Sequence, residues 1–408
     1  MAVEPIIKNR DIIVVGQQPW DVEIGSNCKN IAQEFSKHNR VLYVNSPLDR
    51  INRIKYKNEP RIKKRIDVIN KKADSIVLIQ DNLWNYFPDE MIESINWIKN
   101  DTVYNFLNKI NNKRFARSIA KAIKQLGFEN VILFNDNDIF RCFYLKELLK
   151  PAISIYYSRD FLLSVDYWKL HGKKLEPELI RKSDLCTANS TYLANYCRQY
   201  NPNSFYVGQG CDLEVFTNKQ DLPLPADVAK LKSPVIGYVG ALQSIRLNLD
   251  LLAYVARQKP EWSIVLVGPE DDEFKVSELH QINNIHFLGS KDPDSLAAYI
   301  NSFDVCLNPQ VVNQVTIGNY PRKIDEYLAM GKPVVATRTE GMSVFEQHTY
   351  LGETQEDYVT LIEKALAEDS AEERQERIAF AATHTWENNV KEIYKAINQV
   401  ESEPQTNS

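Results

Sequence analysis

The stretch NYPRKIDEYLAMGKPVVAT, residues 319–337, places a short helix directly before a buried strand. Pro321 has a fixed φ and no amide proton, which suits the first position of a helix. Gly331 suits the end of that helix, and Pro333 prevents its continuation. The stretch therefore predicts a helix over 321–330 followed at once by the strand VVAT, which is one step of an α/β fold.

Short apolar runs separated by helical patterns continue on both sides of this stretch. They are PVIGYVG, WSIVLVG, NIHFLG, DVCLNP and KPVVAT in the rear half, and DIIVVG, RVLYVN, SIVLIQ, NVILFN, AISIYYS, DLCTAN and SFYVGQ in the front half. Each run predicts a buried strand. Strands that alternate with helices indicate a parallel sheet with helices on both faces. Because 408 residues exceed the usual size of one core, we expect two such domains.

The domain boundaries follow from where this alternation stops. Residues 217–234 are polar and contain three prolines, which predicts a linker between domains at 1–216 and 235–385. Residues 386–400 have apolar positions at helical spacing, so we expect a helix that crosses back to pack on the first domain. The tail, 401–408, is expected to be disordered.

The start of the predicted 321–330 helix combines features that suit a nucleotide. Open parallel sheets bind ligands beyond the carboxyl ends of their strands, so two facing domains would form a cleft with two half-sites. The free amides and the dipole of the helix favour an anion, and Lys323 adds a full positive charge. Glu326 lies on the same face, where a carboxylate can accept hydrogen bonds from two vicinal hydroxyls, as in a ribose. The alternative is an ordinary surface ion pair between the two, worth less than ~1 kcal/mol.

These segments resemble a known family of enzymes. PRKIDEYLAMGKPVVAT resembles the signature P-x-K-x-x-E-Y-x-A-x-G-K-P-V-V of bacterial GT-B glycosyltransferases, in the broad family 1 and family 4 group. IGYVGAL, NIHFLGS and FDVCLNPQ resemble strands of the group's donor domain. DLCTANSTYLANY and GQGCDLEVF resemble the end of its acceptor domain, and TWENNVKEIY its crossover helix. Within the group, the segments resemble polysaccharide-assembly enzymes of the teichuronic-acid type.

The resemblance covers nearly the whole chain and implies both a fold and an activity. The implied fold is GT-B: two Rossmann-like parallel-sheet domains facing across a cleft, with a C-terminal crossover helix. The implied activity is transfer of a hexosyl-type sugar from a nucleotide-diphosphate donor to a saccharide or lipid-linked saccharide in surface polysaccharide biosynthesis. No tightly bound cofactor and no metal are expected. Two alternatives remain open, a sugar-nucleotide 2-epimerase and a member that binds nucleotide or glycan without turnover.

The resemblance also implies a donor site. Arg246 occupies the position where relatives hold the diphosphate with a positive side chain, although it could instead be a solvated residue at a helix start. Gly318 stands where many family 4 enzymes carry a further glutamate, so inverting and retaining transfer both stay open. The expected donor residues are Gly240, Arg246, Phe287, Leu288, Gly289, Gly318, Asn319, Tyr320, Arg322, Lys323 and Glu326.

An inverting enzyme also needs a base near the acceptor hydroxyl. Asp160 is the first candidate, because it follows a predicted strand and Arg159 beside it would keep it ionised. Asp166 is the second candidate. The alternative for Asp160 is a helix cap, which aspartate often provides at a strand-to-helix junction.

The loop GQQPWDVEIGSN after the first strand is the expected acceptor contact. Trp20 could stack on a sugar or could simply be buried, and Gly25 and Ser26 follow it in the loop. The loop lacks Gly-x-Gly-x-x-Gly, which argues against a dinucleotide site. The six histidines show no metal-ligand spacing, and the six cysteines are scattered as expected for reduced, mostly buried thiols.

The segment 50–72 is strongly basic, with ten Lys or Arg against two acids. Its mixture of Ile and Tyr with these charges suits an anionic lipid surface. A solvated helix face is the alternative, and nucleic acid is disfavoured because no RNA-binding signature accompanies the charges. The chain shows no signal-peptide pattern and no apolar stretch of bilayer length. We therefore expect a cytoplasmic protein that is peripheral on the inner face of the plasma membrane.

Overall fold

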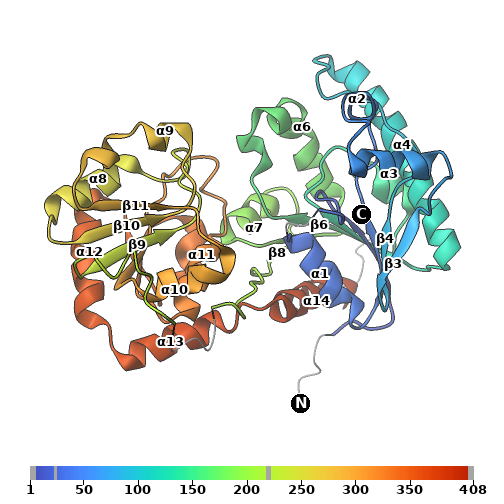
Figure 1. The fold of residues 1–408 in the computed structure, drawn as a ribbon. Helices are drawn as coiled ribbons and strands as arrows, with labels where there is room; N and C mark the ends of the chain where they lie inside the picture. The colour runs from blue at the N-terminus through green and yellow to red at the C-terminus, as the bar shows by residue number, and fades with distance from the viewer. Residues whose placement is uncertain (1–5, 23–24, 217–221, 403–408) are drawn as a thin grey trace. The chain divides into compact units, whose positions relative to one another are not determined.

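The computed structural model describes residues 6–22, 25–216 and 222–402, which form two compact units (Figure 1). The first unit consists of the described residues up to Gly208 together with those from Trp386 onward, and the second is Gln209–Thr385. The division thus precedes the expected linker, 217–234, of which 217–221 lie outside the described residues. Of the expected disordered tail, 403–408 lie outside them too, whereas Glu401 and Ser402 end a helix.

The first unit contains an eight-stranded sheet in the order β3-β4-β2-β1-β5-β6-β7-β8. The strands are β1 Asp11–Val15, β2 Arg40–Val44, β3 Ile76–Gln80, β4 Leu83–Tyr86, β5 Ile132–Asp136, β6 Ile153–Ser158, β7 Leu185–Ala188 and β8 Ser204–Tyr206. All neighbouring pairs are parallel except β3 with β4. The carboxyl ends of β2, β1 and β5 therefore lie side by side at one edge of the sheet.

One predicted strand is present, but it is exposed and not buried. The run SIVLIQ, predicted to be a buried strand, forms the antiparallel edge strand β3, in which Val77, Leu78 and Ile79 are exposed. An apolar run alone cannot distinguish an edge from a centre. The sequence analysis also missed β4, whose buried Asn85 interrupts the apolar pattern and accepts a hydrogen bond of 2.7 Å from Asn45 Nδ2.

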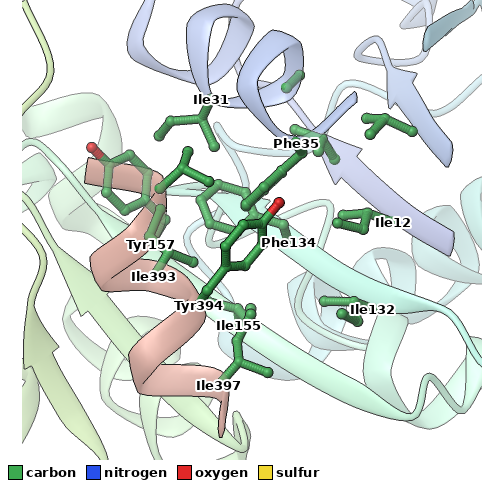
Figure 2. Close-up of a cluster of buried hydrophobic side chains, with 14 of the residues drawn as sticks. Ile12, Ile31, Phe35, Ile132, Phe134, Ile155, Tyr157, Ile393, Tyr394 and Ile397 are labelled. Atoms are coloured by element: carbon green, nitrogen blue, oxygen red, sulfur yellow. The ribbon is translucent and has the colours of Figure 1, made fainter. Parts of the chain in front are cut away.

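Helices cover both faces of this sheet. They are α1 Asn27–Ser36, α2 Arg50–Lys55, α3 Pro60–Ile69, α4 Asp101–Leu126, α5 Leu145–Leu149, α6 Asp166–Lys182, α7 Thr191–Arg198 and α14 Trp386–Ser402. The last of these packs into the core of the first unit: Figure 2 shows Ile393, Tyr394 and Ile397 directed toward Phe35 of α1 and Ile155 of β6. Burying each large apolar side chain contributes roughly 1.5–3 kcal/mol, so α14 is part of this core.

The second unit contains a six-stranded, wholly parallel sheet in the order β11-β10-β9-β12-β13-β14. Its strands are β9 Val235–Val239, β10 Ser263–Val267, β11 Ile285–Gly289, β12 Val305–Asn308, β13 Val334–Thr337 and β14 Tyr350–Gly352. Its helices are α8 Leu249–Gln258, α9 Asp272–Lys275, α10 Leu296–Asn301, α11 Arg322–Ala329, α12 Gln355–Glu368 and α13 Ala371–Ala381. The five runs predicted in this half are all strands, and β14 is the one that was missed.

Two chain-wide expectations can be compared with the described residues. All six cysteines are buried and free, as predicted. No helix in the described ranges is long and apolar enough to cross a membrane.

Candidate functional site

The helix α11 is formed as the sequence predicts, with a one-residue difference at its start. Pro321 is the N-cap rather than the first helical residue, so the helix begins at Arg322. Gly331 ends it in the left-handed conformation, at φ +71°. The Gly331 amide donates to Leu328 O at 2.8 Å and the Lys332 amide to Tyr327 O at 3.0 Å, which closes the last turn.

Lys323, in the first turn of α11, lies across Gly240, the residue that follows β9. A Cβ atom built on Gly240 would come within 2.0 Å of Lys323 Cε and 2.5 Å of its Nζ. Gly240 also has φ +145°, a conformation that other residues rarely adopt. The same ammonium lies 5.6 Å from the centre of the Tyr238 ring. Glycine at 240 thus makes room for the lysine side chain over the turn after β9.

Lys323 and Glu326 do not form the surface ion pair that was the alternative. Within the described residues, neither side chain has an oppositely charged group within 4.0 Å. Burial lowers the pKa of Lys323, as do the nearby charges of Arg246 and Arg322, against the opposing effect of Glu326. Burial likewise raises the pKa of Glu326, against the opposing effect of Lys323. Both side chains are half-buried, and partly desolvated charges without contacting partners raise the free energy of the protein. A ligand that bonds to them lowers it.

Arg246 brings a second cation to the same place. It lies in the loop between β9 and α8, and its charge acts on both Lys323 and Tyr238. The loop is fixed by a bond of 2.9 Å from the Val311 amide to Arg246 O. Asn248, not Arg246, caps α8, so Arg246 lies outside that helix. The geometry thus brings together Gly240, Arg246, Lys323 and Glu326, residues that the sequence placed in one site.

Arg322 and the β11 residues have other surroundings. Arg322 is exposed and lies 4.0 Å from Asp212. Phe287 stacks on His280, with ring centres 3.9 Å apart and planes 14° apart. Leu288 packs against the core of the second unit. Gly289 has φ +69° and open space where a Cβ would lie, so a flat group could approach its backbone.

The turn before α11 supplies the last three predicted donor residues. Gly318 is buried in this turn and Asn319 is half-buried. Tyr320 is only 5% exposed, and its hydroxyl is 3.2 Å from His384 Nδ1. The Tyr320 side chain therefore packs in the core of the second unit, and only the backbone of Tyr320 can face a ligand.

A buried polar cluster behind this turn was missed by the sequence analysis. Asp325 is fully buried; its Oδ1 lies 2.5 Å from His384 Nδ1, and its Oδ2 accepts a hydrogen bond of 3.1 Å from Cys211 Sγ. The one available signal was a carboxylate on the buried face of α11, between Ile324 and Tyr327. This cluster anchors α11 beside the predicted donor residues.

In the first unit, Asp160 meets Arg159 as expected. Arg159 Nη1 is 2.6 Å from Asp160 Oδ2, and its Nε is 2.8 Å from Oδ1 of the fully buried Asp136. Burial opposes the charge of Arg159, but Asp136 and Asp160 raise its pKa above the usual value. Asp160 is exposed and caps neither the 3-10 turn Leu162–Ser164 nor α6, so the helix-cap alternative is wrong. Asp166 is the exposed first residue of α6.

The three predicted acceptor residues do not share one role. Trp20 is half-buried, its ring edge-on to Tyr43 at 5.0 Å, and its amide donates to Asn45 Oδ1 at 2.7 Å. Ser26 is buried and caps α1 by accepting from the Lys29 amide at 3.3 Å. Gly25 has open space around its Cβ position. Ser26 is thus already engaged, whereas Trp20 and Gly25 leave surface for a ligand.

Among the residues that the structure describes, no group of three or more His, Cys, Asp or Glu side chains could hold a metal ion. Lys323 and Arg246 both contribute positive charge to the candidate donor site.

Comparison with known proteins adds a family and a relative. Residues 233–370 match the family model described as glycosyl transferases group 1. TuaH of Bacillus subtilis (strain 168), whose name assigns it to teichuronic acid biosynthesis as a glycosyltransferase, is 26% identical over 234 residues. That match covers 55% of this chain and 59% of TuaH.

Solved structures share the fold over nearly the whole chain. Sucrose-phosphate synthase from Thermosynechococcus elongatus has a TM-score of 0.62 at 13% identity, covering 97% of this chain and 100% of that one. Anabaena HepE in complex with UDP has a TM-score of 0.63 at 15% identity, covering 96% and 100%. Residues 233–370 are thus similar to the glycosyl transferases group 1 family, and the chain has the GT-B fold.

Proposed function

We propose that this protein is a glycosyltransferase that moves a sugar from a nucleoside-diphosphate donor to a saccharide or lipid-linked saccharide acceptor in surface polysaccharide assembly. The observation that carries the proposal is the pair of cations, Lys323 in the first turn of α11 and Arg246 near it, with Glu326 one turn on. Among the described side chains, neither the lysine nor the glutamate is in an ion pair. The family match in residues 233–370 and the name of TuaH support it.

In the proposed reaction, these charges stabilise the leaving group. Sugar transfer from such a donor builds negative charge on the departing diphosphate. Fixed cations and helix amides stabilise that charge without reorganising, and each charged hydrogen bond contributes roughly 1.5–3 kcal/mol. Glu326 would accept hydrogen bonds from the ribose hydroxyls, and Gly289 would let the base approach the β11 backbone. We propose that Lys323 and Arg246 serve in place of a metal ion.

Asp160 is the proposed base for an inverting reaction. It is exposed at the carboxyl end of β6, where a carboxylate could accept a proton from an acceptor hydroxyl, and Arg159 Nη1 lies 2.6 Å from its Oδ2. The loop around Trp20 and Gly25, after β1, is the proposed acceptor contact.

The test of the proposed function measures nucleotide release from UDP-, GDP- and TDP-sugars, with and without an acceptor extract. Release of a nucleoside diphosphate that depends on acceptor is the expected result. Conversion of the sugar nucleotide without acceptor would indicate an epimerase instead. Thermal stabilisation by nucleotide without any turnover would indicate a binding protein, and either outcome would contradict the proposal.

We also propose that the first unit contacts an anionic membrane surface through the segment 50–72. Every residue of α2 is exposed, including Ile54 at 68%. The Ile51 amide donates to Ser94 Oγ at 3.2 Å, so α2 lies beside Trp97, which is 71% exposed. Apolar side chains flanked by Lys55 and other free cations suit a headgroup layer.

Flotation with liposomes tests this surface. We expect binding to vesicles that contain phosphatidylglycerol, little binding to phosphatidylcholine alone, and loss of binding as salt rises. The double variant Ile54→Asp and Lys55→Glu should bind at least ~5-fold less, since about 1 kcal/mol is expected for the cation alone. Lys230→Glu, an exposed lysine of the second unit, is the matched control. Equal binding of the double variant and this control would contradict the proposed membrane contact.

A further inference from the structure

A cavity of about 320 Å³ lies in the first unit, over the carboxyl ends of three adjacent strands. Its lining includes Pro19 after β1, Ser46 after β2 and Arg141 after β5, and α2 and α3 complete it. Parallel sheets bind ligands at this edge, so the position itself suits a substrate. No residue of the predicted donor or acceptor set lines the cavity.

Arg141 is held in place by a buried carboxylate and is not consumed by it. Its Nε lies 2.5 Å from Asp138 Oδ2, and the other oxygen of Asp138 accepts from the amides of Phe140 and Arg141 at 3.1 and 2.9 Å. Asp138 is 1% exposed. Within the described residues, the two Nη groups of Arg141 have no hydrogen-bond acceptor. The fork of a fixed guanidinium is the group that binds phosphate or carboxylate in two parallel bonds.

The other charged groups of the lining carry both signs. Arg65 forms two bonds of 3.0 and 2.9 Å to Asp21, so its charge is balanced. Asp49 caps α2 and also accepts from Ser94 Oγ at 2.6 Å. Two exposed groups of opposite sign, Arg61 and Glu59, have no ion pair among the described side chains. Arg141 is balanced by Asp138 in charge, but it is the cation of the lining that is held in place and still has both Nη groups to donate. Arg61 is a second, exposed cation of the same lining.

A second unsatisfied group lies in the same lining. Ser46 Oγ is buried and has no hydrogen-bond partner in the described structure. Buried hydroxyls are nearly always bonded, so an orphan of this kind needs an explanation. Tyr56 and Ile62 add apolar surface beside it. An anionic group that accepts from Arg141 and Ser46, attached to a sugar or lipid stem, would satisfy all of these features.

We propose that this cavity binds the anionic group of the acceptor substrate, a phosphate or a carboxylate. The proposal rests on the proposed glycosyl transfer and deepens it, because it makes the acceptor a charged molecule. A neutral sugar needs no arginine fork oriented by a buried aspartate. A phosphate would belong to a lipid-linked diphosphate, and a carboxylate to an acidic sugar.

Calorimetric titration of the full chain with pyrophosphate and, separately, with glucuronate tests the proposal. UDP is present at saturation, so that pyrophosphate cannot report on the donor site in the second unit. We expect one probe to bind saturably, and the probe that binds identifies phosphate or carboxylate as the ligand chemistry. Arg61→Ala and Arg141→Gln should each weaken that binding about 10-fold or more. Lys63→Ala, an exposed lysine of α3 outside the cavity lining, should leave it unchanged.

The contrary outcomes are distinct. Absence of saturable binding by both probes would overturn the proposal, and so would equal losses in Arg61→Ala and Lys63→Ala, which would indicate general attraction to basic helices. If Arg141→Gln unfolds, as thermal denaturation would reveal, the exposed Arg61 carries the comparison. The titration with UDP, done first, reports on the donor site alone. Absence of UDP binding would count against the donor site and the proposed function, and the two probe titrations would still test the cavity.

Discussion

Lys323→Ala is expected to weaken binding of a nucleoside diphosphate by about 10- to 150-fold, since one charged hydrogen bond contributes roughly 1.5–3 kcal/mol. Lys323 lies at the start of α11, where the helix amides already favour an anion, and Arg246 supplies the neighbouring charge. Calorimetry with UDP and GDP measures the effect. Glu326→Ala should weaken nucleotide binding at least ~10-fold as well, because the ribose hydroxyls lose their acceptor.

Lys323→Ala is not expected to lower the stability of the protein, although it lowers nucleotide affinity. Lys323 is partly desolvated and has no ion pair among the described residues, so its charge raises the free energy of the folded protein when no nucleotide is bound. Lys323→Ala should therefore leave the free energy of unfolding unchanged or raise it, while nucleotide affinity falls. If Lys323 only supported the fold, Lys323→Ala would lower both the free energy of unfolding and the nucleotide affinity.

Two further variants separate the charge from its position. Gly240→Ala keeps the lysine but places a methyl group where Lys323 Cε now lies, so nucleotide affinity should fall although no charge is removed. Lys275→Ala removes an exposed lysine of the same unit that pairs with Asp272 at 3.0 Å, and should have no effect. Unchanged nucleotide affinity in both Lys323→Ala and Glu326→Ala would refute the assignment of the donor site.

The parts of the fold that were predictable are those in which each strand carries its own signal. Runs such as PVIGYVG and RVLYVN are continuous and apolar because β9 and β2 are buried on both faces. The same signal misled at β3, since an exposed edge strand can have the same composition. It failed at β4, where Asn85 interrupts the apolar run, and at β14, which has only 3 residues.

The donor site could be predicted because its residues lie in motifs with fixed spacing. Gly240 and Arg246 come from the segment after β9 and Glu326 from α11, and a family resemblance links such segments without a structure. No comparable signal linked Ser46 to Arg141 in the cavity lining, or Cys211 to His384. Those groups meet through tertiary packing, and a single sequence contains no record of which distant side chains come into contact.

Asp325→Ala is expected to cause the largest loss of stability of the substitutions considered, about 3–5 kcal/mol. Asp325 is fully buried and bonds on both oxygens, to His384 Nδ1 at 2.5 Å and to Cys211 Sγ at 3.1 Å. Removing it leaves the buried Cys211 thiol without its acceptor and takes from His384 Nδ1 its shorter contact, so that the Tyr320 hydroxyl at 3.2 Å remains. Out of a typical total of about 5–15 kcal/mol, such a loss is large.

The position of this cluster makes the expected consequence specific. Cys211 lies near the residue where the chain enters the second unit, and His384 lies near the residue where it leaves. Their backbones are also joined, by a bond of 3.0 Å from the Cys211 amide to His384 O. Asp325 therefore fastens both ends of the unit to the helix that carries Lys323 and Glu326. Amide hydrogen exchange in α11 and around Cys211 and His384 should become faster in Asp325→Ala, whereas exchange in the first unit should not change.

Asp325→Asn and Asp272→Ala are the matched controls for this effect. Asparagine keeps the shape and one acceptor oxygen, so its loss should be smaller than that of alanine. Asp272 is a fully exposed carboxylate of the same unit, and its removal should change stability by less than ~0.5 kcal/mol. If Asp325→Ala behaved like Asp272→Ala, the buried carboxylate would not be what holds α11 in place. Nucleotide affinity should fall in Asp325→Ala together with the loss of protection in α11, because Lys323 keeps its charge there and loses only its fixed position.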